Sequence, residues 1–226
     1  MSEHNITIES GTSKRLPIGG KYSEKDVIIT ASGGSGGGDT SIEDGIIQRT
    51  LTEYTNDRVT SVGAYAFHSC TRLTKVILPK VNSLDISAFN NCTALTSIEI
   101  PLVQSIAIQT FYGCNSLTAL NMPSLKTLGT QSVRNCKKLA KVDLASATSI
   151  GALSFDSCAL LNALIIRTAN ICTLGNINAL TNTPIASGTG YIYVPATLVD
   201  SYKAAANWST YATQFRAIED YPDICG

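Results

Sequence analysis

The segment that decides the fold is LDISAFNNCTALTSIEIP, which runs from Leu84 to Pro101. Its pattern returns along the chain at a fixed interval of 22 residues. The interval is clearest in the cysteines, because five of the seven lie on it: Cys70, Cys92, Cys114, Cys136 and Cys158. The chain is therefore an internal repeat, with Cys172 and Cys225 outside the series.

Apolar residues recur at the same interval, and we call each set of equivalent positions a column. Three of the columns are Phe67, Phe89, Phe111, Val133 and Phe155; Leu73, Leu95, Leu117, Leu139 and Leu161; and Val76, Ile98, Leu120, Val142 and Leu164. One unit cannot bury its own apolar face, whereas stacked units join the columns into a continuous core. Five such units run from Val59 to about Arg167.

Each unit contains a predicted strand and a predicted helical turn. Residues Leu95 to Pro101 alternate apolar and polar, which predicts a half-buried strand with Ile98 and Ile100 facing inward and the proline at its end. The preceding segment, Ile86 to Leu95, spaces its apolar residues by three and four, which predicts a short helical turn on the convex side. We therefore expect the α/β fold class, as a right-handed leucine-rich-repeat solenoid of 22-residue repeats.

The pattern IxxxAFxxCxxLxxIxIP resembles the BspA-type leucine-rich repeat of bacteria, over about half of the chain. It differs from the commoner leucine-rich form, which places an Asn or Cys after the strand, where this chain has Val81, Val103 or Leu125. The flanking segments, Ile6 to Gly34 and Tyr191 to Ile218, resemble those around such repeats in tail-associated proteins of prophages from gut Firmicutes. This second resemblance implies a virion or a bacterial cell surface as the setting.

The sequence divides into a small N-terminal β module, a linker, a repeat region and two caps. We expect the β module at 1–31, a flexible Gly/Ser linker at 32–41, an N-terminal cap at 42–58, the five repeats at 59–167, and an irregular repeat with a helical C-terminal cap at 168–226. In the last region Ile192 and Val194 are expected to continue the strand ladder. Two helices, near 197–206 and 209–217, would then cover the end of the core around Trp208.

Composition excludes two classes of partner. Seventeen basic residues are balanced by 17 acidic ones, so the net charge does not favour nucleic acid. The opening residues lack the apolar stretch of a secretory signal, and no later run approaches the roughly twenty apolar residues of a membrane span. We expect no membrane insertion and no signal peptide in the chain as given, although a signal removed earlier would leave the same sequence.

The candidates for chemistry favour structural roles. The cysteine column suits buried thiols that donate weak hydrogen bonds rather than a metal stripe, and Cys172 and Cys225 could pair only if the tail folds back. His68 lacks the partners of a catalytic triad, and Glu99 with Asp143, two turns apart, resembles a solvated face more than a glycosidase pair. We expect no catalytic residue, cofactor or metal.

The outward positions of the strands are the predicted binding surface. The residues proposed to contact a partner are Lys75, Ile77, Ser97, Glu99, Asn121, Lys141 and Asp143, within a shallow surface that also includes Ala119, Ala163 and Ile165. Tyr191, Tyr193, Tyr202 and Tyr211 are expected to pack in the C-terminal cap rather than bind. The leading hypothesis is adhesion to protein or cell-wall glycan, with residues 1–31 attaching to a larger assembly. A structural spacer is the alternative, and a hydrolase comes last because no convergent polar pocket is evident.

Overall fold

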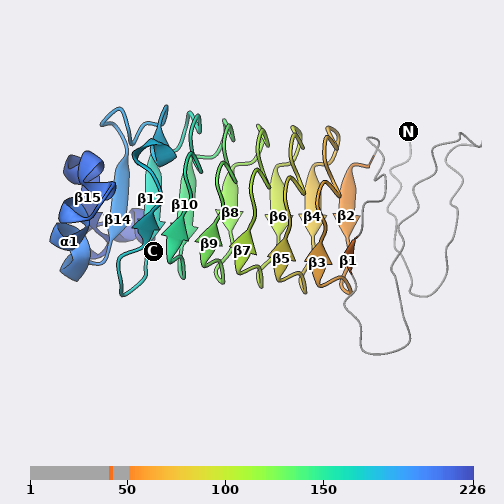
Figure 1. Ribbon diagram of the computed structural model, residues 1–226, viewed down its shortest axis with the longest axis horizontal. Helices are drawn as coiled ribbons and strands as arrows, with labels where there is room; N and C mark the ends of the chain where they lie inside the picture. Colours follow the sequence, from red (N-terminus) through yellow and green to blue (C-terminus); the bar gives the residue numbers. More distant parts are fainter. Residues whose placement is uncertain (1–40, 43–50) are drawn as a thin grey trace, which may run out of the picture.

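The computed structural model describes residues 41–42 and 51–226, and these form a single elongated solenoid with a C-terminal cap (Figure 1). The predicted β module, nearly all of the linker and part of the N-terminal cap lie outside the described residues. Ser41, assigned to the linker by composition, lies in strand β1 and pairs with Ser61. The repeat solenoid is confirmed, but its helical content is low. In the described residues the only α-helices are the short α1 (Val199–Ala204) and α2 (Pro222–Cys225).

The predicted strands form a parallel row on one side of the solenoid. Every inward residue of the column Val76, Ile98, Leu120, Val142 and Leu164 is buried, as the alternation predicts. Ile192 and Val194 continue this row, as expected, because β14 pairs with β12. The strands of this row are β2 (Glu53–Thr55), β4 (Lys75–Ile77), β6 (Ser97–Glu99), β8 (Ala119–Asn121), β10 (Lys141–Leu144), β12 (Ala163–Ile166), β14 (Tyr191–Val194) and β15 (Phe215–Ala217).

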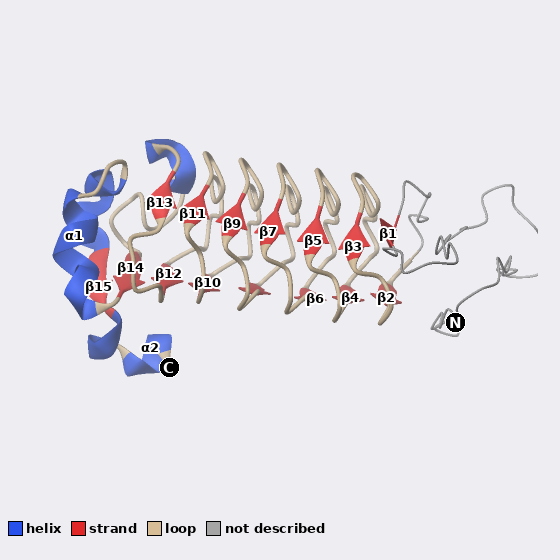
Figure 2. Ribbon diagram, turned by 60° about the horizontal axis from the view of Figure 1, so that its bottom comes forward, coloured by secondary structure: helices blue, strands red, loops and turns tan. Residues whose placement is uncertain are grey.

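A second parallel sheet, which the sequence pattern did not indicate, runs along another side (Figure 2). Each of its seven strands is only two residues long, and in the six strands from Ser61 onward the second residue is buried in the core. Its strands are β1 (Ser41–Ile42), β3 (Ser61–Val62), β5 (Ser83–Leu84), β7 (Ser105–Ile106), β9 (Thr127–Leu128), β11 (Ser149–Ile150) and β13 (Thr173–Leu174). This sheet and the row of strands together enclose the apolar columns.

The predicted helical turn on the convex side is wrong. Residues 86–95 form successive tight turns, because Ser87 and Asn91 adopt left-handed φ values of 54° and 59° that no α-helix accepts. Alternate amides then bond to the next coil, as from Phe89 N–H to the carbonyl of Thr110 at 2.9 Å. Apolar residues spaced by three and four are buried by this series of turns just as they would be by one face of a helix.

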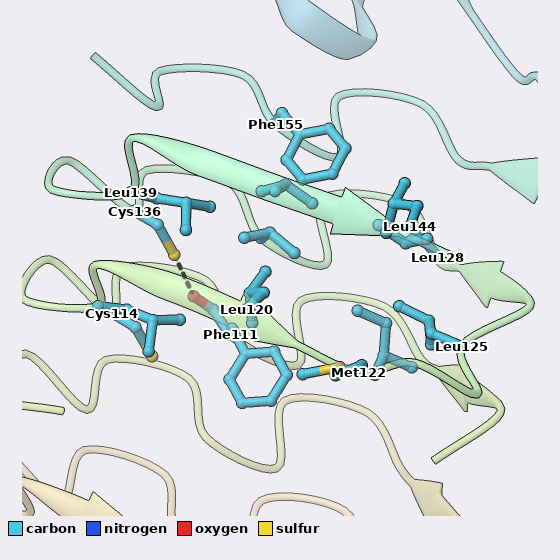
Figure 3. Packing of buried hydrophobic residues seen from close by; sticks show 14 of the residues in the cluster. Phe111, Cys114, Leu120, Met122, Leu125, Leu128, Cys136, Leu139, Leu144 and Phe155 are labelled. Carbon is cyan, nitrogen blue, oxygen red and sulfur yellow. Dashed lines mark hydrogen bonds between the residues drawn. The ribbon is translucent and has the colours of Figure 1, made fainter. Parts of the chain in front are cut away.

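The core is built from stacked columns (Figure 3). The rings of Phe67 and Phe89 stack with centroids 4.7 Å apart, and those of Phe89 and Phe111 are 5.4 Å apart. Beside them each repeat cysteine points inward, and the thiol of Cys136 donates to the carbonyl of Phe111 at 3.2 Å. Equivalent bonds from Cys92, Cys114 and Cys158 confirm the role of structural thiols.

The C-terminal cap closes the last coil. Its elements are η1 (Ile177–Leu180), η2 (Ala196–Leu198), α1, η3 (Trp208–Gln214), β15 and η4 (Ile218–Asp220), followed by α2. Trp208 is the predicted plug: it is buried, and its indole N–H donates to the carbonyl of Cys172 at 2.7 Å. The helix expected over 209–217 is wrong at its end, because Phe215–Ala217 pairs with β14 and adds a strand to the row.

We expect the seven thiols to be unreactive in the native protein. All are buried and none forms a disulfide, and burial raises the pKa of Cys114 and of Cys172 to about 12, so the reactive thiolate is scarce at neutral pH. Titration with an aromatic disulfide reagent should detect few thiols in buffer and all seven in guanidinium chloride. The variant Thr71→Cys places a cysteine at an exposed position beside Cys70, and it should add one thiol that reacts rapidly in buffer. Several fast thiols in the unaltered protein would contradict the packing described.

Candidate functional site

The seven predicted partner-binding residues share one surface, the outer side of β4, β6, β8 and β10, which we call the strand face. Within its ladders Lys75 lies opposite Ser97, Ile77 opposite Glu99, and Asn121 opposite Asp143. Each lies beside an inward residue of the core column, so strand alternation alone places it on the outside. Whether they bind a partner remains a prediction.

The row of strands is interrupted in the middle of this face. β6 ends one sheet and β8 begins the next, although both lie in neighbouring coils. Between the paired strands β4 and β6, Leu78 N–H donates to the carbonyl of Glu99 at 2.9 Å. A shallow groove of about 510 Å³ lies at the interruption, lined among others by Ser97, Glu99 and Asn121. No strand ladder therefore joins β6 to β8.

The C-terminal half of the strand face is covered by the end of the chain. Tyr221, Ile224 and Cys225 pack over Ala163 and Ile165 in an apolar cluster separate from the main core. Ile165 is 0% exposed, so the expectation that these two residues belong to an open surface is wrong. Figure 2 shows α2 folded back outside β12 and β14. Cys225 is thus on the outside of the sheet and Cys172 is in the core, and both are free thiols.

Two of the predicted residues, Lys141 and Asp143, are engaged by this cover. Lys141 Nζ donates to the carbonyl of Ile224, near the end of α2. Arg167 binds both carboxylate oxygens of Asp143 at 2.7 to 3.1 Å and also donates to the carbonyl of Cys225. Hydrogen bonding to Asp143 raises the pKa of Arg167 above its ordinary value. The uncovered part of the strand face therefore contains Lys75, Ile77, Ser97, Glu99 and Asn121.

The groups weighed for catalysis remain apart in the structure. His68 is exposed and its Nδ1 lies 3.0 Å from the hydroxyl of its neighbour Ser69, whereas Cys70 is buried. Asp143 is held by Arg167, which leaves Glu99 without a second free carboxylate beside it. Across 41–42 and 51–226, no three histidine, cysteine or acidic side chains are grouped as metal ligands would be.

The four tyrosines expected to pack at the C-terminal cap lie on two sides of the sheet. Tyr202 and Tyr211 are buried in the cap, as predicted, and Tyr191 and Tyr193 are on the outer side of β14, where they pack against the tail. The signal for this outward placement was present, because inward Ile192 and Val194 require their neighbours to face outward. These tyrosines extend the strand face and border a second pocket.

Comparison with known proteins identifies the repeats. The model for the "BspA type Leucine rich repeat region" matches six copies across residues 48–162 and 82–188, more than half of the chain. The chain belongs to the BspA-type leucine-rich-repeat family. No match was found among curated protein sequences. In the described part of this BspA-type chain, no helix has the length and apolar character needed to cross a bilayer.

Several solved structures resemble this BspA-type chain. A leucine-rich-repeat protein from T. pallidum is 30% identical, with 50% of this chain and 58% of that chain covered and a TM-score of 0.48. One from Bacteroides ovatus is 20% identical, with coverages of 63% and 47% and a TM-score of 0.39. The pneumococcal vaccine antigen PcpA is 16% identical, with coverages of 74% and 40% and a TM-score of 0.56, and shows the shared fold alone. The match spans about half of the length of these proteins.

Proposed function

We propose that this chain is a non-enzymatic adhesion protein of a phage tail or bacterial surface, and that its strand face holds an extended segment of a partner protein. Leucine-rich-repeat proteins are generally binding proteins, and the long row of strands suits a partner that makes many small contacts. The interruption between β6 and β8 carries the proposal. A groove between two strands that no ladder joins suits an extended polypeptide, which can lie along the outer side of both.

The side chains around the groove support a protein partner over a glycan at this surface. Glu99 and Asn121 line the groove with a carboxylate and an amide, and Pro101 and Pro123 border it at the strand ends. Lys75 offers an ammonium group on the neighbouring strand β4. No aromatic ring lies among the uncovered outward residues of β4, β6 and β8 to support a sugar. A mixed set of small contacts matches the variety of a peptide.

The surface or virion setting follows from the resemblance of the flanking segments and completes the proposal. In this scheme residues 1–31 attach the chain to a larger assembly and the solenoid projects from it. A spacer without a ligand is the competing function, and it requires a strand face that tolerates free substitution.

The test is binding of the full chain to intact gut Firmicute cells by cosedimentation, with and without prior protease treatment of the cells. We expect saturable binding that protease abolishes and that the triple variant Lys75→Ala, Glu99→Ala and Asn121→Ala weakens by about tenfold or more. A loss of about 1.4 kcal/mol of binding free energy, summed over the three contacts, is enough to weaken binding tenfold.

The matched control is Lys80→Ala, Gln104→Ala and Lys126→Ala, three exposed positions outside the strand face that should leave binding unchanged. Binding that persists on protease-treated cells would contradict a protein partner and indicate a glycan. No binding at all would contradict adhesion to these cells and favour the spacer.

A further inference from the structure

A second pocket lies at the C-terminal end of the strand face, between the sheet and the folded-back tail. Its volume is about 460 Å³, which is within the range of small-molecule sites. Three different parts of the chain supply its polar walls, namely β10 with Lys141, the segment around β14 with Thr189, Tyr191 and Tyr193, and α2 with Asp223. Asn162 adds an exposed amide. This pocket is distinct from the groove between β6 and β8.

The pocket depends on two structural features that the regular repeats lack. β14 places tyrosines at outward positions where β12 has Ala163 and Ile165, with Tyr191 opposite Ala163 and Tyr193 opposite Ile165. The tail then brings Asp223 and Ile224 over the same strands. The rings of Tyr193 and Tyr221 meet edge to face with centroids 5.4 Å apart, which fixes the tail against the sheet.

The hydroxyl of Tyr193 is available to a ligand. The residue is only 2% exposed, yet its hydroxyl makes no hydrogen bond to any described part of the chain. The hydroxyl oxygen is not fully buried either, because it is not one of the buried polar atoms that lack a partner. It therefore retains contact with solvent. A nearly buried tyrosine that lines a pocket with a free hydroxyl is a ready hydrogen-bonding group.

The charges around the pocket favour a neutral ligand. The guanidinium of Arg216 covers one face of the Tyr191 ring, 4.2 Å from its centroid, which leaves the other face for a ligand, and the two cations Arg216 and Lys141 disfavour a quaternary ammonium ligand there. Among the residues that line the pocket, one cation, Lys141, is balanced by one carboxylate, Asp223, so the lining carries no net charge that would favour an anion such as phosphate. What remains is a compact molecule with hydroxyl groups that both donate and accept, and with an apolar face that can pack on a tyrosine ring.

We propose that this pocket binds one neutral sugar unit, a hexose or an N-acetylhexosamine, of a surface glycan. Tyr191 supplies the aromatic contact, the Tyr193 hydroxyl and Asn162 supply hydrogen bonds, and Asp223 accepts from sugar hydroxyls. The site gives the protein a glycan contact apart from the groove between β6 and β8, and it does not depend on the proposal that this groove holds a protein segment.

Ligand-observed NMR on the full chain, with free sugars as probes, tests the proposal. Glucose, galactose, N-acetylglucosamine and N-acetylgalactosamine are each titrated alone, beside the charged analogues glucosamine and glucuronate. We expect saturable binding of at least one neutral sugar, with weaker binding of both charged analogues. Tyr193→Phe removes one hydroxyl without disturbing the packing and should weaken binding roughly fivefold, and Asp223→Asn should weaken it by at least as much.

Asp220→Asn is the matched control, since Asp220 is an exposed acid of the same tail outside the pocket, and it should bind like the unaltered protein. Thermal melting confirms that each variant is folded. Three results would overturn the proposal: no saturable binding of any neutral sugar, tighter binding of a charged analogue, or binding that Tyr193→Phe and Asp223→Asn leave unchanged. The triple variant of the strand face keeps this pocket intact, so each proposal can fail without the other.

Discussion

Replacing Phe111 by alanine is expected to lower the free energy of unfolding by about 3 to 5 kcal/mol. Phe111 is fully buried in the middle of the solenoid, stacks on Phe89, and accepts the thiol of Cys136 at its carbonyl. Its removal leaves a cavity that the neighbouring coils cannot fill, because each coil is held in register by ladders on two sides. Denaturation in urea, followed by circular dichroism, measures the loss.

Ile108→Ala provides the control for this variant. Ile108 is in the same coil but 47% exposed, so its truncation should change stability by no more than about 0.5 kcal/mol. Similar losses for the two variants would contradict the assignment of the phenylalanine column to the core.

Replacing Trp208 by alanine is expected to lower the free energy of unfolding of the C-terminal end by about 3 to 5 kcal/mol. The indole packs against Tyr202 and Phe215, with centroids 5.6 and 5.8 Å away, and bonds the carbonyl of Cys172. Coils of a solenoid contact only their neighbours, so the damage should remain local. Pulsed alkylation with peptide mapping should therefore find Cys172 labelled while Cys92 and Cys114 remain protected.

Thr210→Ala serves as the control for the cap, because Thr210 follows Trp208 closely in η3 and is exposed. It should leave the labelling pattern and the melting temperature unchanged. If Cys172 stays protected in the Trp208 variant, the indole is not what closes the last coil.

The repeat fold was predictable because each coil repeats the same local requirements. Residues such as Leu95, Ile98 and Ile100 had to face inward at every turn, and the structure places all of them in the core. The cysteine column followed in the same way, and its thiols form the expected bonds to backbone carbonyls. Alternation also placed the predicted partner-binding residues on one outer surface.

The errors arose where the local pattern was compatible with two structures. Spacings of three and four between Ala88, Phe89, Cys92 and Leu95 suit a helix, but left-handed turns at Ser87 and Asn91 bury the same side chains. Residues 215–217 were assigned to a helix because their strand partner, β14, could not be recognised from the local sequence. The strands of the second sheet are two residues long, too short to show alternation.

By itself, the sequence determined the solenoid, its inward columns and the outer strand face, because each depends on side chains a few residues apart within one repeat. Only the tertiary structure decided which part of that face is open. The tail reaches Arg167 from 58 positions away along the chain, through contacts that have no period. The gap between β6 and β8 and the tyrosine pocket likewise depend on how separate coils meet. Packing between distant segments, rather than local pattern, sets both candidate sites.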